Sequence, residues 1–179
     1  QLSAFDQNGE IIVRRPLTRL PHAPNHPTVI NSRNWCGVGL AVEPNKNDWW
    51  RRIWVIERAH PDVPGSKNRL FAVDAEGQTR ILVDLEDIDP RSVACATDRT
   101  DLSRILVVDG SSGDLISFNT DGELMSQYKL GVNLVCFGER DGLWVAGRKS
   151  AKRLDLSDLS VLAEYEFKTS AVPIGLAVR

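Results

Sequence analysis

The sequence predicts an all-β protein, a β-propeller of four-stranded antiparallel blades. Three observations predict it: one hairpin pattern recurs along the chain, two other strand patterns recur before it, and helical periodicity is nearly absent. The 179 residues suffice for one domain with a buried core. With 42% hydrophobic residues, 26% charged residues and a formal net charge of −2, the chain has no basic field that would attract nucleic acid.

The recurring hairpin consists of an apolar strand, an Asp or Asn, a polar turn and a second strand. It occurs as LSAFDQNGE, LFAVDAEGQ, LISFNTDGE and AKRLDLSDL, with the markers Asp6, Asp74, Asn119 and Asp155. Such side chains accept hydrogen bonds from the amides that follow them, so we expect them to fix the turns. The segment 155–164 has some helical character, but its place in the repeat predicts a turn and a strand.

Two further strands precede the hairpin. The first is small and apolar, as in VGLAV, SVACA, NLVCF and the final IGLAVR, and the second reads RIWVIE, RILVVD and GLWVAG. The first strands begin near Gly39, Ser92, Asn133 and Gly175, at spacings of 53, 41 and 42 residues. Four strands repeated at roughly this interval are typical of propeller blades.

The side chains suit that arrangement. Small residues of the first strand, such as Ala41 and Ala94, fit where blades converge on the axis. We expect the bulky Trp54, Leu106 and Trp144 of the second strand to pack between blades, because a four-stranded sheet cannot bury either face alone.

The order of elements indicates an incomplete ring. The chain divides into a partial blade (1–15), a long loop (16–37), three whole blades (38–84, 92–128 and 132–167) and a second partial blade (171–179). Strand 174–179 could close a ring beside 2–13, but we favour a segment of a larger, six-bladed ring with residues missing at one or both ends. Open sheet edges and bare blade faces would then invite association.

The stretches GLAVEPNKND, IWVIE, NRLFAVDAEGQ and RILVVDGSSGDLISFNTDGE resemble blades of the NHL-repeat and gluconolactonase-like (senescence-marker-protein) propellers. The resemblance covers nearly the whole chain. It implies a propeller fold and one of several functions: calcium- or zinc-dependent lactonase, lyase of the streptogramin type, or non-catalytic binding protein.

The resemblance also implies where a metal would lie, at the inner ends of the first strands, where a blade typically starts Pro-Asn-Gly-Leu. Here Arg91 stands where Asn is expected, Val132 stands where an acidic ligand is expected with Asn133 beside it, and 172–175 offers no ligand. A hard cation needs several oxygen ligands, so we expect no cofactor, with calcium or zinc as the alternative.

We expect a binding site on the face shared by the loops between blades and the loops between second and third strands. Long loops on a rigid scaffold often carry function, and two here are long, 14–37 and 57–69. They contain all three histidines, His22, His26 and His60, which are the candidates for a catalytic base or ligand. The other candidate ligand-binding residues on this face are Arg19, Trp35, Arg58, Arg91, Asp109, Asn133 and Arg148, with Lys149 beside them.

Both predictions have a structural alternative. The histidines could be ordinary surface residues in loops that contain several prolines, and Asp109 could hold its own loop in place by hydrogen bonds. A separate patch, Trp49, Trp50 and Arg51, is expected on the opposite turns, where an exposed indole would suit a protein partner or a sugar ring. The alternative is that one of the two Trp side chains covers the blade edge while the other is half exposed.

The three cysteines, Cys36, Cys95 and Cys136, form neither a disulfide framework nor a zinc motif, and we expect buried thiols. No apolar run approaches the roughly 18 residues of a membrane span. The compartment stays open, a secreted or periplasmic location included. The first functional hypothesis is a scaffold that binds a small molecule or a protein. The alternatives are a metal-dependent lactonase or lyase, and a structural subunit that assembles through its open blades.

Overall fold

The computed structural model describes residues 2–5, 11–15, 37–43, 51–59, 64–97, 103–138 and 142–168. These residues form strands and turns, and none of them is helical. Over the same residues, therefore, no helix has the length and apolar character needed to cross a membrane. The all-β prediction is confirmed, and so is a turn rather than a helix after residue 154.

Three antiparallel four-stranded sheets follow one another along the chain, and each is ordered as in the sequence. The first sheet contains β3 (Gly37–Glu43), β4 (Arg52–Glu57), β5 (Arg69–Val73) and β6 (Thr79–Asp84). The second contains β7 (Pro90–Thr97), β8 (Ser103–Asp109), β9 (Asp114–Phe118) and β10 (Leu124–Lys129). The third contains β11 (Leu134–Gly138), β12 (Gly142–Ala146), β13 (Ser150–Leu154) and β14 (Val161–Glu166).

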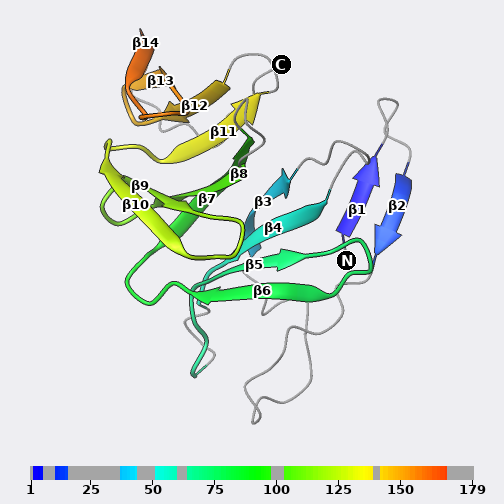
Figure 1. Ribbon diagram of the computed structural model, residues 1–179. Helices are drawn as coiled ribbons and strands as arrows, with labels where there is room; N and C mark the ends of the chain where they lie inside the picture. The colour runs from blue at the N-terminus through cyan, green and yellow to red at the C-terminus, as the bar shows by residue number, and fades with distance from the viewer. Residues whose placement is uncertain are drawn as a thin grey trace.

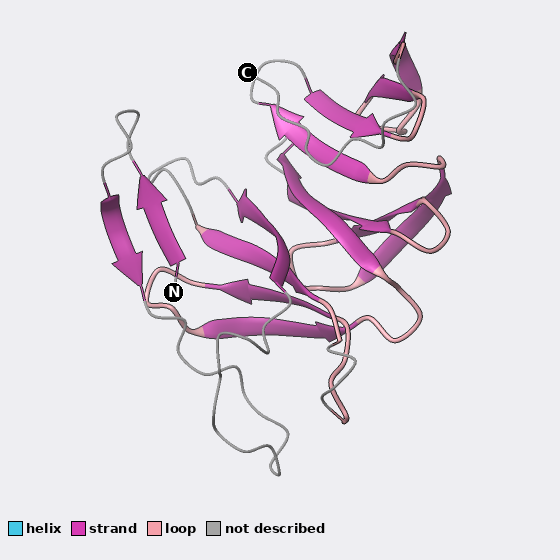
Figure 2. Ribbon diagram, turned by 180° about the vertical axis from the view of Figure 1, so that it is seen from behind, coloured by secondary structure: helices cyan, strands magenta, loops and turns pink. Residues whose placement is uncertain are grey.

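A two-stranded hairpin, β1 (Leu2–Phe5) and β2 (Ile11–Arg15), lies at the first sheet's end of the molecule (Figure 1). The view from behind shows the same order of hairpin and sheets (Figure 2). The described strands do not close into a ring.

Two apolar cores lie between successive sheets. The first joins Trp54, Ile56 and Leu70 of the first sheet to Ile105 and other residues of the second. The second joins the opposite face of the second sheet to the third, and its members include Ala94, Leu106, Val108, Leu143, Val145 and Leu154. Because side chains alternate along each strand, the second sheet buries both of its faces.

The first strands of the three sheets lie next to one another, with β7 in contact with both β3 and β11. A Cβ atom on Gly39 would stand 3.1 Å from Cγ1 of Val93, tighter than most real Cβ contacts, so the side chain of Val93 would have to give way. The small residues of this strand therefore permit the close approach of neighbouring sheets.

The turns between third and fourth strands are fixed as predicted wherever the structure describes them. Oδ1 of Asp74 accepts the amides of Glu76 and Gln78 at 3.0 and 2.8 Å. Oδ1 of Asn119 likewise accepts hydrogen bonds from the amides of Asp121 and Glu123, and Oδ1 of Asp155 accepts one from the amide of Ser157. Asp6 lies outside the described residues.

Glu43, Arg52 and Trp54 form a buried polar cluster at the end of the first sheet where β3 ends and β4 begins. Glu43 is 1% exposed and accepts hydrogen bonds from Arg52 Nε at 2.8 Å and Nη2 at 3.0 Å, and from Trp54 Nε1 at 2.9 Å. Arg52 Nη1 also donates to the carbonyl of Thr120 at 3.0 Å, in a turn of the second sheet. This cluster thus fixes the two sheets to each other.

Trp144 lies on the face of the third sheet that points away from the second. Leu143 and Val145 point into the core between the second and third sheets, so Trp144 lies on the opposite face. There it is half-buried beside Tyr165, with ring centroids 5.6 Å apart. Trp54 and Leu106, at the equivalent positions, each face the sheet that follows theirs. The segment 171–179 that would follow the third sheet lies outside the described residues, so packing of Trp144 between blades stays a prediction.

Burial of the thiols is confirmed for Cys95 and is only partial for Cys136. Cys95 is buried, and burial raises its pKa to about 12, while Cys136 is half-buried. Cys36 lies outside the described residues.

Candidate functional site

Two kinds of loop meet at one end of the sheets. The loops between sheets (85–89 and 130–133) approach the described parts of the loops between second and third strands (58–59, 64–68, 110–113 and 147–149). The Gly110 amide donates to the carbonyl of Asp89 at 2.7 Å, and the Val132 amide to that of Gly113 at 2.9 Å. We call this surface the loop face. It positions five of the residues singled out in the sequence.

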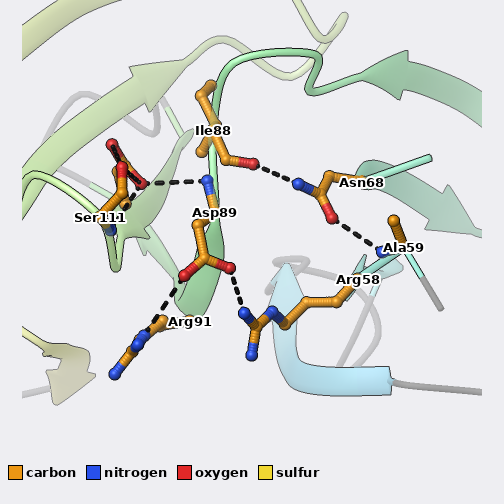
Figure 3. Close-up of polar contacts among 8 residues, drawn as sticks. Arg58, Ala59, Asn68, Ile88, Asp89, Arg91 and Ser111 are labelled. Atoms are coloured by element: carbon orange, nitrogen blue, oxygen red, sulfur yellow. Dashed lines mark hydrogen bonds and ion pairs between the residues drawn. The ribbon is translucent and has the colours of Figure 1, made fainter. Parts of the chain in front are cut away.

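Arg58 and Arg91 share one carboxylate on the loop face. Arg58 Nη2 lies 2.5 Å from Oδ1 of Asp89, and Arg91 Nε lies 3.6 Å from Oδ2 (Figure 3). Asn68 braces the same loop, since Nδ2 donates to the carbonyl of Ile88 at 2.7 Å and Oδ1 accepts the amide of Ala59. Arg58 and Arg91, two of the arginines predicted to bind a ligand, therefore already pair with a carboxylate of the protein itself.

Asp109 organises the neighbouring loop. It is 5% exposed, and Oδ1 accepts the amides of Asp89 and Ser111, each at 3.0 Å. Oδ2 accepts the hydroxyl of Ser112 at 2.7 Å. Burial tends to raise the pKa of Asp109, but the hydrogen bonds from Ser112, Ser111 and Asp89 together hold it below the usual range. These bonds are those of a loop tie, and a ligand role for Asp109 stays a prediction.

Asn133 and Arg148 lie elsewhere on the loop face, beside a hollow of about 310 Å³. Its walls come from the loop that enters the third sheet and from the loop between β12 and β13. The lining residues are Leu130, Gly131, Val132, Asn133, Gly147, Arg148, Lys149, Ser150 and Lys152. The volume is at the small end of ligand pockets, and the lining combines apolar residues such as Leu130 and Val132 with the charged Arg148 and Lys149.

Glu57 is a residue of interest that the sequence analysis missed. It ends β4 as Asp109 ends β8, and that shared position after a buried strand could have revealed it. Its Oε2 is buried with no hydrogen-bond partner. Burial raises the pKa of Glu57, and the charge of Arg69 only partly opposes this. A carboxyl of this kind is suited to proton transfer.

Replacing Glu57 with Gln should remove a pH-dependent loss of stability. Because the folded-state pKa is raised, the contribution of Glu57 to stability is fully present below the unfolded value of about 4.5 and falls as pH rises through the folded value. We expect E57Q to be more stable than the wild type at pH 8, with the difference disappearing towards pH 4. Urea unfolding across this range measures it.

The control for this experiment is E86Q, whose carboxylate is 74% exposed. It should follow the wild type at every pH. If E57Q also followed the wild type, Glu57 would be solvated like a surface carboxylate.

The remaining sequence-predicted residues fall into two groups. His22, His26, His60, Arg19, Trp35, Trp49 and Trp50 lie outside the described residues, so their roles stay predictions. Arg51 is 64% exposed and lies 3.7 Å from Oε1 of Glu43. The patch of Trp49, Trp50 and Arg51 stays a prediction.

Over the described part of the chain, no three His, Cys, Asp or Glu side chains are grouped so that they could hold a metal ion. Arg91 has its own carboxylate partner, and Asn133 faces cations rather than carboxylates. Those residues do not form the oxygen-rich set that calcium needs.

Comparisons with known proteins give no functional assignment. No protein-family model matches the sequence, and no curated protein does. A crystal structure of a protein of unknown function from Bacteroides caccae is similar over 88% of this chain, with 13% sequence identity and a TM-score of 0.44. This chain spans 65% of that protein.

Proposed function

We propose that the three sheets are consecutive blades of a β-propeller and that the protein is a binding scaffold whose ligand occupies the loop face. The sheets pack face to face in chain order, and their first strands adjoin one another, which supports a blade arrangement about a common axis. A ring of about six such blades, of the NHL-like type, stays part of the proposal.

The hollow beside Asn133 and Arg148 is the observation that carries the binding function. It joins a concave space to polar groups on loops that rigid sheets hold in place. Elsewhere on the described loop face, Asp89 pairs with Arg58 and Arg91, and Asp109 accepts hydrogen bonds from Asp89, Ser111 and Ser112. Ligand binding is therefore proposed at the third sheet, with a small molecule or an exposed group of a protein as the ligand.

Chemical-shift mapping with a library of neutral, anionic and cationic small molecules tests this function. We expect perturbed amides to cluster at 130–133 and 147–150. The turns at 74–78, 119–123 and 155–160, at the other ends of the strands, serve as the internal control. Shifts confined to those turns, or no saturable shift with any compound, would overturn the proposal.

An enzyme is the second candidate, and Glu57 is the observation that favours it. A buried carboxyl with an unpartnered oxygen and a raised pKa has the properties of a general acid. A lactonase or lyase would use it together with a histidine from 14–37 or 57–69, and with calcium or zinc if it follows the metal-dependent type.

A structural subunit is the third candidate. The last strand of the third sheet, β14, exposes Val161, Leu162 and Tyr165 by 48%, 55% and 58%. An edge strand with exposed apolar side chains favours pairing with another chain. A stable multimer in native mass spectrometry would support this role over the binding role.

A further inference from the structure

The internal repeat provides a template for what the hollow binds. Residues of the three sheets can be matched through strand pairing, because Ala41 pairs with Trp54, Ala94 with Leu106 and Cys136 with Trp144. Four residues after these second-strand partners stand Arg58, Gly110 and Arg148. Arg148 is therefore the counterpart of Arg58.

Arg58 shows what this position does when it has a partner. Its guanidinium meets the carboxylate of Asp89 at 2.5 Å, from the loop that leads into the second sheet. The corresponding residue after the third sheet is Val172, because GLAV at 175–178 matches GLAV at 39–42. Arg148 thus has the position of Arg58 in the repeat, but the residue that corresponds to Asp89 is Val172, which has no carboxylate.

The hollow exists because two residues at the entry to the second sheet are replaced by smaller ones at the equivalent positions of the third. Asp89 and Arg91 correspond to Gly131 and Asn133. In the second sheet, the side chain of Arg91 covers Gly110 so closely that a Cβ atom there would overlap it. In the third sheet, a Cβ atom on Gly131 would meet nothing within 4 Å. Space filled by an internal ion pair in one sheet is open in the next.

The charge of the hollow is positive. Neither Arg148 nor Lys149 has an ion-pair partner within the described part of the chain, and both are exposed. Lys152 is opposed by Glu164, whose Oε1 lies 3.5 Å from its Nζ. Two lining cations are thus left without a counter-charge, and the amide of Asn133 adds a hydrogen-bond donor.

We infer that the hollow binds a small organic anion through a carboxylate or phosphate group, which Arg148 and Lys149 hold as Arg58 holds Asp89. The planar fork of a guanidinium matches both groups, and an ammonium adds charge without directional demands. This inference rests on the proposed binding function and adds the chemical class of the ligand.

Titrations with acetate, inorganic phosphate and acetamide, followed by amide chemical shifts at low ionic strength, test the inference. Acetamide matches acetate in size and lacks its charge. We expect saturable shifts at 130–133 and 147–150 with one or both anions and none with acetamide. The tighter anion identifies the ligand as a carboxylate or a phosphate. A double variant, R148Q with K149Q, should weaken anion binding at least tenfold.

Two further variants complete the design. R80Q removes an exposed cation from a turn at the other end of the strands, where Arg80 pairs with Asp74, and should bind as the wild type does. G131D should supply an internal carboxylate in the open space and abolish binding, while circular dichroism shows an intact fold. Asp is among the residues that tolerate the positive φ of 66° at this position.

The inference is overturned if acetamide binds as tightly as the tighter anion, if the double variant binds anions as tightly as R80Q does, or if no anion gives a saturable shift. A neutral compound that maps to the loop face in the library screen would then leave the binding function standing without its anionic ligand. If no compound in that screen bound, both the proposed binding function and the anionic ligand would be contradicted.

Discussion

Replacing Trp54 with Ala should lower the free energy of unfolding by about 3–5 kcal/mol. The side chain is 0% exposed and packs in the core between the first and second sheets with Ile56 and Leu70. Its removal would leave a cavity that two apposed sheets cannot close without moving. The loss also takes away the indole donor to Glu43, so the effect should lie at the upper part of this range.

Urea unfolding followed by circular dichroism measures this loss. The W54F variant is the control that keeps an aromatic ring in the core and removes the indole N–H. It should cost less than W54A, and the difference between the two variants reports the packing contribution. A loss below about 1 kcal/mol for W54A would place Trp54 at the surface, because exposed substitutions have effects of that size.

Replacing Glu43 with Ala should also cost about 3–5 kcal/mol, for an electrostatic reason. The guanidinium of Arg52 is 12% exposed and would lose both of its carboxylate contacts. The indole N–H of Trp54 would lose its acceptor at the same time. A buried cation and a buried donor without partners are each costly, while the exposed Arg51 would turn to solvent at little cost.

The matched control is E86A, in which a 74% exposed carboxylate loses a contact of 3.4 Å to Lys67. We expect a change of about 0–1 kcal/mol there. Equal effects in E43A and E86A would contradict the buried cluster. A double variant, E43A with W54A, should lose less than the sum of the two single losses, because the two side chains share a hydrogen bond.

Much of the fold follows from local pattern. Recurring short apolar runs separated by polar turns identified the strands, because a sheet packed on both faces is built from such runs. Asp74, Asn119 and Asp155 identified the turns, because their side chains bond to amides two to four residues away. Such signals need only a few consecutive residues, so they can be recognised without knowing how the sheets pack.

The candidate site followed less completely. The sequence placed Arg58, Arg91, Asp109, Asn133 and Arg148 on one set of loops, but it treated them as equivalent. The structure separates Arg58 and Arg91, which share the carboxylate of Asp89, from Arg148, which faces an open hollow. Glu57 was missed because its significance lies in an unpartnered oxygen, and burial of a single atom is invisible in a strand pattern.

The sequence by itself determined the repeated strand order, the hairpin turns and the small residues of each first strand, since these depend on local backbone preferences and side-chain size. Only the tertiary structure decided which charges of the described residues are neutralised, on which face of the third sheet Trp144 lies, and where the loop face is hollow. The physical reason is that ion pairing and burial depend on residues distant in sequence, such as Arg58 and Asp89, whose meeting is set by how whole sheets pack.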